Sequence, residues 1–166
     1  MNWLKNFVRP KLKELVGGQR EIPENLWNKC PGCEEMIFHR DLEKNFRVCP
    51  LCGYHLRIGS IERLKMLFDN GEFQRVDLPE VSADPLKFRD RRKYTDRLKE
   101  AQTKTGLMDA LTVAYGRMGG LSVVIAALDF SFMGGSMGSR VGEGFITAAR
   151  LAVVQNASLI VIPSSG

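Results

Sequence analysis

Residues 28–56 read NKCPGCEEMIFHRDLEKNFRVCPLCGYHL and contain all four cysteines of the 166-residue chain. Cys30 and Cys33 are two residues apart, as are Cys49 and Cys52, and fifteen residues separate the pairs. This spacing is typical of a zinc site with four thiolate ligands, because the turn inside each pair brings both sulfurs toward one point. The sequence therefore predicts a zinc ribbon in which these four cysteines bind one Zn²⁺ ion.

The alternative for the same cysteines is two disulfides. Cysteines this close in sequence rarely reach disulfide geometry. The first residues do not resemble a secretory signal, so a reducing compartment is expected. Four protein ligands leave no position for water, so the zinc is predicted to be structural and to contribute about 10 kcal/mol of folding free energy. Residues 36–38 and 46–48 are expected to form the two arms of a hairpin.

Composition indicates a globular chain, with 44% apolar and 26% charged residues. The net charge of +5 allows anionic partners, and no apolar run approaches the length of about 20 residues that a membrane span needs. Charge is uneven, since residues 108–166 contain only Asp109, Arg117, Asp129, Arg140, Glu143 and Arg150 as charged residues. We expect four segments: an N-terminal arm (1–25), a zinc ribbon (26–58), a helical connector (59–107) and the first part of an α/β core (108–166).

Two helices are predicted in the connector. Ser60 is a suitable N-cap and Gly71 a suitable stop for a helix over residues 60–71. A second helix is expected over residues 90–105. The basic residues 89–93 could hold a phosphate, although acidic neighbours also allow an ordinary solvated surface.

The core is predicted to contain strands over residues 111–115, 121–128 and 159–162, with a glycine-rich turn over 116–120. A helix over residues 141–155, capped by Ser139, should follow the segment DFSFMGGSMGSRVGEGF. Glycines in such a loop let a ligand approach the backbone, and the first amides of the helix are open to an oxyanion or phosphate. The segment lacks P-loop spacing, and residues 108–166 contain no histidine, so any catalysis there should depend on backbone amides.

Four motifs together resemble a known family: WNKCPGCEEMIFHRDLEKNFRVCPLCGYHLR, PLKFRDRRKYTDRLKEAQTKTG, LDFSFMGGSMGSRVGEGF and the final strand that leads into SSG. In this order and spacing they resemble the carboxyltransferase beta subunits of bacterial and plastid-type acetyl-CoA carboxylase. The resemblance implies a crotonase-like (ClpP/crotonase) α/β core of repeated ββα units, incomplete here, behind a zinc ribbon.

The resemblance also implies an activity and a set of partners. The family moves a carboxyl group from carboxybiotin, held on a biotin carboxyl carrier protein, to acetyl-CoA, and the product is malonyl-CoA for fatty acid biosynthesis. Its beta subunit assembles with an alpha subunit as an α2β2 heterotetramer, and a partner biotin carboxylase uses ATP. The implied location is the bacterial cytoplasm or the plastid stroma.

Site residues follow from the same resemblance. Residues Gly134, Gly135, Ser136, Met137 and Gly138 match the loop that lines the family's acyl-CoA pocket, and Gly134 and Gly135 are expected to act in catalysis. Ser164, Ser165 and Gly166 match the start of a second glycine turn, and Ser165 and Gly166 are expected to contribute to an oxyanion hole.

Two further expectations concern the chain as a whole. Members of the family continue beyond this second turn, so the 166 residues are expected to be a truncated form that is inactive unless another chain supplies the remainder. The alternative function is a non-catalytic zinc ribbon that binds nucleic acid through basic residues around the metal, namely Lys29, Arg40, Lys44, Arg47 and Arg57.

Overall fold

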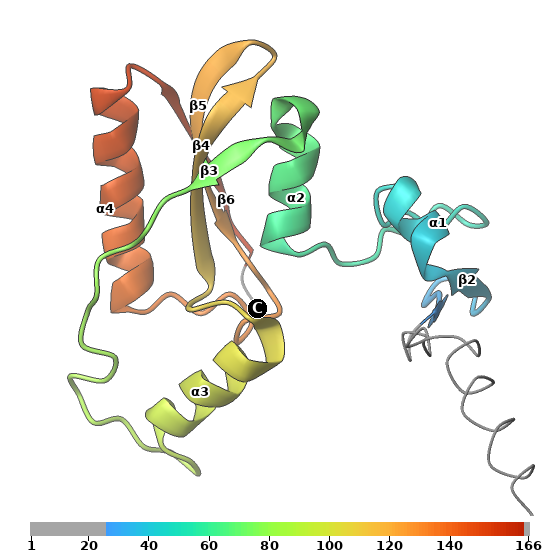
Figure 1. The fold of residues 1–166 in the computed structure, drawn as a ribbon. Coiled ribbons are helices and arrows are strands. Elements are labelled where there is room, and N and C mark those ends of the chain that lie inside the picture. The colour runs from blue at the N-terminus through green and yellow to red at the C-terminus, as the bar shows by residue number, and fades with distance from the viewer. Residues whose placement is uncertain (1–25, 165–166) are drawn as a thin grey trace, which may run out of the picture. The chain divides into compact units, whose positions relative to one another are not determined.

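A computed structural model describes residues 26–164 of the chain (Figure 1). The described residues fall into two compact units, 26–57 and 58–164, which are considered separately below. The N-terminal arm predicted for residues 1–25 lies outside the described residues. Within the described part, no helix is both long and apolar enough to cross a membrane.

The first unit contains two short strands and one short helix. Strand β1 (Trp27–Lys29) pairs antiparallel with β2 (Met36–Phe38), and α1 (His39–Lys44) follows directly. The predicted pairing of residues 36–38 with 46–48 is therefore wrong. The chain turns into α1 immediately after β2, and Phe46 and Arg47 have positive φ angles of 53° and 60°, which an extended arm cannot contain.

The second unit is built on a four-stranded sheet in the order β3-β4-β5-β6. Its strands are β3 (Phe73–Arg75), β4 (Leu111–Met118), β5 (Leu121–Leu128) and β6 (Ser158–Ile162). Strand β4 pairs antiparallel with both β3 and β5, whereas β6 is parallel to β5. Helix α4 (Ser139–Val154) connects β5 to β6, as a parallel pair requires a long crossover.

Helices cover both faces of this sheet (Figure 1). Val124 and Ala126 of β5 share a buried cluster with residues of α4, whereas Ile125 and Ala127 share one with α2 (Ser60–Leu67). Successive strand residues point to opposite faces, so a strand covered on both sides is apolar throughout. This explains why β5, which was predicted over the same residues, contains a continuous apolar run.

The predicted turn over residues 116–120 is only partly correct. Strand β4 continues to Met118, and only Gly119 and Gly120 form the connection, with φ angles of 59° and 78° that suit a two-residue hairpin turn. Gly116 lies inside the strand, where a Cβ atom would come within 2.7 Å of the Phe68 ring. This glycine therefore makes room for an aromatic ring and does not form a turn.

The connector helices differ from their predicted bounds. Helix α2 ends at Leu67, and a separate 3-10 turn (η2, Asp69–Gly71) follows Phe68. The N-cap of α2 is Gly59, so the prediction that Ser60 caps this helix is wrong. Helix α3 (Tyr94–Thr105) begins four residues later than predicted and ends at Thr105, as predicted, with Gly106 as its C-cap at a φ of 68°.

Candidate functional site

The four cysteine sulfurs form one cluster in the first unit. All four sulfurs lie within 4.8 Å of one another, with 3.6 Å between Cys30 and Cys52 and 3.8 Å between Cys33 and Cys49. A tetrahedral zinc ion with Zn–S bonds of about 2.3 Å places its sulfurs about 3.8 Å apart. All four cysteines are free thiols, so the disulfide alternative is excluded in this structure, and the sulfurs are arranged to bind one zinc ion.

The two halves of this cluster have the same backbone geometry. The amide of Glu34 donates to the carbonyl of Cys30, and the amide of Gly53 donates to the carbonyl of Cys49, both at 2.9 Å. Glu34 and Gly53 each follow the second cysteine of a pair, and both have positive φ, 62° and 73°. Each pair is thus a tight turn that ends in a left-handed residue, which brings its two sulfurs together.

The thiols differ in acidity. Burial raises the pKa of Cys49, but hydrogen bonds from the amides of Cys52 and Leu51 outweigh it and lower the pKa to about 7. The backbone hydrogen bond at Tyr54 lowers the pKa of Cys52, but desolvation and the hydrogen bonds with the other thiols raise it to about 12. Zinc binds thiolates, so occupation of the cluster must release protons, and zinc affinity should rise with pH.

In the second unit, residues 130–138 form a loop between β5 and α4, which we call the glycine loop. Met133, Gly134 and Gly135 have consecutive positive φ angles of 49°, 70° and 75°. The amide of Gly135 donates to the carbonyl of Phe132 at 2.9 Å, which closes a turn. The loop therefore contains three successive left-handed residues, and the two glycines among them present backbone without side chains.

The same loop ends at the first turn of α4. Gly138 is the N-cap, and no side chain caps the helix, so the prediction that Ser139 is the cap is wrong. Ser139 is instead the first helical residue. The structure places the predicted residues Gly134, Gly135, Ser136, Met137 and Gly138 in one loop, with Met137 exposed. The other two predicted catalytic residues, Ser165 and Gly166, lie outside the described residues.

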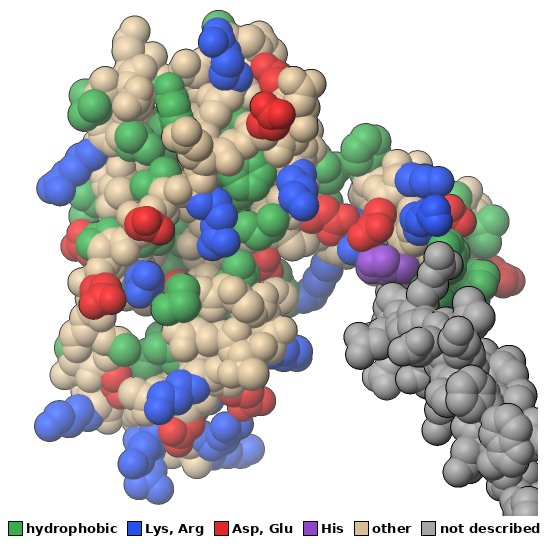
Figure 2. Space-filling view, in the orientation of Figure 1, with side chains coloured by type: hydrophobic (Ala, Val, Ile, Leu, Met, Phe, Trp, Pro, Cys, Tyr) green, Lys and Arg blue, Asp and Glu red, His purple; other side chains and the backbone are tan. Residues whose placement is uncertain are grey.

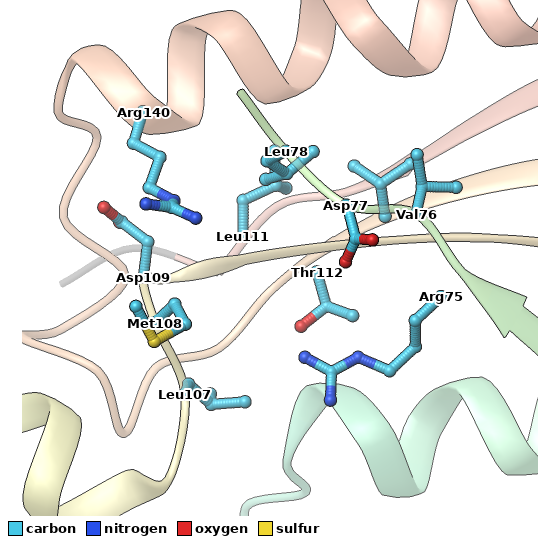
Figure 3. A pocket seen from close by; sticks show the side chains of 11 residues that line it. Arg75, Val76, Asp77, Leu78, Leu107, Met108, Asp109, Leu111, Thr112 and Arg140 are labelled. Atoms are coloured by element: carbon cyan, nitrogen blue, oxygen red, sulfur yellow. The ribbon is translucent and has the colours of Figure 1, made fainter. Parts of the chain in front are cut away.

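A cavity of about 350 Å³ lies beside the first turn of α4 (Figure 3). Asp109, just before β4, and Arg140, in the first turn of α4, lie on one side, and Arg75 and Asp77 lie on the other. Burial raises the pKa of Asp109, although the Ala110 amide and the charge of Arg140 oppose this shift. The remaining lining residues are Val76, Leu78, Leu107, Met108, Leu111, Thr112 and Val113.

A smaller hollow of about 80 Å³ adjoins the end of the glycine loop. Its lining includes Gly138, Asp109, Arg140 and Tyr94 of α3. A Cβ atom on Gly138 would lie 3.5 Å from the Tyr94 hydroxyl. Sequence reasoning did not select Tyr94, Asp109 or Arg140. The available signal was that Asp109 and Arg140 are two of the few charges in an otherwise apolar segment.

The basic residues 89–93 precede α3. Figure 2 shows Lys and Arg side chains interspersed with Asp and Glu at the end of the second unit where α3 lies. Arg92 pairs with Glu100 at 2.8 Å, and Arg97 pairs with Asp90 at 2.9 Å. The alternation of charges and these exposed pairs are typical of a solvated surface, which was the second of the two expectations for this segment.

Comparison with known proteins identifies the family. The model of the carboxyl transferase domain matches residues 60–166, and the model of the acetyl-CoA carboxylase zinc finger domain matches residues 27–52. The chain belongs to the carboxyl transferase domain family. The predicted fold class, a crotonase-like α/β core with a four-cysteine zinc ribbon, is confirmed by these matches and by the cysteine cluster.

The similar curated proteins are more specific. Over all 166 residues, the chain is 52% identical to the acetyl-coenzyme A carboxylase carboxyl transferase subunit beta of Granulibacter bethesdensis and 52% identical to that of Rhodopseudomonas palustris. It covers 54% and 51% of these proteins, respectively. The chain thus spans about half the length of the curated relatives it matches. The predicted resemblance is confirmed, and the nucleic-acid alternative is not favoured.

Proposed function

We propose that this chain serves as a carboxyltransferase beta subunit of acetyl-CoA carboxylase. The reaction moves a carboxyl group from carboxybiotin on the biotin carrier protein to acetyl-CoA and yields malonyl-CoA for fatty acid biosynthesis. Two observations support this proposal: the sequence identity to bacterial beta subunits and the glycine loop before α4. The glycine loop is the single observation on which the proposed reaction chemistry depends.

The chemistry explains why a backbone loop suits this reaction. Removal of a proton from the acetyl methyl group places negative charge on the thioester oxygen, and amide donors stabilise such an oxyanion. The left-handed residues at Gly134 and Gly135 leave room for a thioester to approach the backbone. We assign Gly134 and Gly135 to catalysis, residues 134–138 to acyl-CoA binding, and Ser165 and Gly166 to a second set of amide donors.

The assembly and location belong to the same proposal. A carboxyltransferase alpha subunit would complete an α2β2 heterotetramer and bind the biotin side of the reaction, and biotin carboxylase would use ATP to load the carrier protein. The zinc ion held by the four cysteines would be structural, because all four of its positions are occupied by thiolates. The named relatives are bacterial, so we place the protein in the bacterial cytoplasm.

A pair of glycine substitutions tests this proposal. Gly134 and Gly119 have similar φ angles, 70° and 59°, and neither has an atom within 4 Å of an added Cβ. Alanine should therefore cost both sites similar backbone strain, about 1 kcal/mol, but only Gly134→Ala alters the loop. Calorimetric titration with acetyl-CoA should show affinity lowered about tenfold in Gly134→Ala and unchanged in Gly119→Ala.

The result that contradicts the proposal is equally clear. If the unaltered chain binds no acetyl-CoA, or if Gly134→Ala binds it as tightly as Gly119→Ala does, the loop is not the acyl-CoA site.

A further inference from the structure

Asp129 is the only charged residue that is buried within residues 26–164, with 5% of its surface exposed. It lies directly after β5 and before the glycine loop. Its own amide donates to the carbonyl of Ala110 at 2.8 Å, which fixes its backbone against the start of β4. A buried carboxylate is costly unless hydrogen-bond donors surround it, so its partners indicate what it holds in place.

Both oxygens of the carboxylate accept hydrogen bonds. Oδ2 accepts from the amide of Ser60 at 2.7 Å, at the N-terminus of α2. Oδ1 accepts from the amide of Ser131 at 2.9 Å and from its hydroxyl at 2.5 Å. Desolvation raises the pKa of Asp129, but the Ser131 hydroxyl and the Ser60 amide outweigh it, so the pKa is lowered and the group is ionised at neutral pH.

These bonds begin a continuous series of turns that ends in the glycine loop. The amide of Phe132 donates to the carbonyl of Asp129 at 3.2 Å, and the amide of Gly135 donates to the carbonyl of Phe132 at 2.9 Å. The Phe132 side chain is 2% exposed and therefore fixed in the core. Each turn starts at the residue where the previous one closes, so hydrogen bonds connect Asp129 to Gly135 without a break.

We propose that Asp129 is a positioning residue for the glycine loop: its carboxylate holds the segment from Ser131 to Gly135 against the N-terminus of α2 and so orients the backbone amide of Gly134. The amide of Gly135 already closes the turn onto Phe132 and serves to hold the loop. The inference rests on the proposed function, since it assigns the Gly134 amide to an acyl-CoA thioester. Asp129 itself contacts no reacting atom in this scheme and acts only through the loop.

Three variants separate this role from general stabilisation. Asp129→Asn keeps the shape of the side chain but replaces one acceptor oxygen with a donor, which must face one of the amides. Ser131→Ala removes only the hydroxyl bond to Oδ1. Thr112→Val is the matched control: it removes the buried contact between the Thr112 and Ser60 hydroxyls, 3.3 Å apart, and leaves the three bonds to Asp129 in place.

Hydrogen exchange measured by mass spectrometry on the 166-residue chain provides the first readout. In Asp129→Asn, exchange over residues 131–138 should be about tenfold faster than in the unaltered chain, with β4 and β5 no faster than in Thr112→Val. Ser131→Ala should show a smaller increase over the same residues. Unchanged loop exchange in both variants, or an increase that only parallels β4 and β5, would overturn the inference.

Acetyl-CoA affinity, measured by calorimetric titration, provides the second readout. It should fall about tenfold in Asp129→Asn and stay unchanged in Gly119→Ala, the affinity control used above. Equal affinity in Asp129→Asn and the unaltered chain overturns the positioning role. If the unaltered chain does not bind acetyl-CoA, the proposed function fails, and the exchange result alone then decides whether Asp129 holds the loop.

Discussion

The carboxylate of Asp69 holds the hairpin turn between β4 and β5. Its two oxygens accept from the amides of Gly119 at 2.8 Å and Gly120 at 2.9 Å, although these residues are about fifty positions away in sequence. Both amides point toward one side chain because Gly119 and Gly120 have positive φ. A single residue in η2 thus connects the end of α2 to the tip of the hairpin.

Asp69→Asn should lower the melting temperature at pH 7, because an amide group can accept from one of these donors but presents its NH2 to the other. The amides of Gly120 and Gly119 lower the pKa of Asp69 in the folded chain. The stabilisation is therefore complete above the unfolded pKa of about 3.9 and is lost as pH falls through the folded value.

Thermal unfolding followed by circular dichroism checks this expectation. The difference in melting temperature between Asp69→Asn and the unaltered chain should shrink as pH is lowered from about 4 toward 2. A difference of constant size at every pH would show that ionised Asp69 contributes nothing through its charge.

Some single residues could be assigned from sequence and others could not. The four cysteines were found because ligand spacing is local chemistry that does not depend on the rest of the fold. Ser60 and Ser139 were wrongly predicted as N-caps, because the rule for caps considers only the residues next to the helix. The carboxylate at the N-terminus of α2 comes from Asp129, which no local pattern connects to Ser60.

At the scale of elements, β4 and α2 are coupled through Gly116 and Phe68. A Cβ on Gly116 would lie 2.7 Å from one ring carbon of Phe68 and 3.1 Å from the carbonyl oxygen of Glu72. Phe68 is 3% exposed and stacks on Phe73 with 5.3 Å between ring centroids. A Cβ at this position would therefore have to displace a buried, stacked ring, which favours glycine in the strand.

Gly116→Ala should therefore reduce the free energy of unfolding by about 1–3 kcal/mol, which is the usual cost of overpacking. Gly142→Ala is the control, since an added Cβ in this part of α4 meets nothing within 4 Å. In a helix that change should instead stabilise by about 0.5–1 kcal/mol. Urea unfolding of both variants measures the two values, and a Gly116→Ala chain as stable as Gly142→Ala would refute the packing argument.

The same contact shows why the boundaries of β4 were missed. The sequence GRMGG has three glycines in five residues, and a local rule interprets such a run as one turn. Only the last two glycines form the turn, because the first lies under an aromatic ring contributed by a residue 48 positions earlier. The buried strand β5 was predicted correctly because its apolar, β-branched residues carry the signal without reference to distant residues.

At the scale of the whole molecule, the two units depend on different forces. The second unit has two buried clusters on either side of its sheet. In the first unit, among residues 26–57, the buried members of the cluster are only Cys30, Ile37, Leu42 and Cys49. A core this small rarely supports a fold without a metal or another constraint. Zinc binding should therefore supply most of the stability of residues 26–57.

Removal of zinc with a strong chelator at neutral pH should unfold the first unit and leave the second folded. Hydrogen exchange measured by mass spectrometry should show loss of protection over residues 26–57 and unchanged protection in β4, β5 and α4. Cys30→Ser should reproduce the result without a chelator. Retained protection over residues 26–57 in zinc-free protein would contradict a structural role for the metal.

The long-range cap on α2 has a consequence for synthesis of the chain. Ser60 and its partner Asp129 are separated by 69 positions, so α2 leaves the ribosome well before the carboxylate that accepts from its first turn. An eight-residue helix is marginal in water by itself. We therefore expect α2 to remain a transient helix during translation and to become fixed only after β5 has emerged and paired with β4.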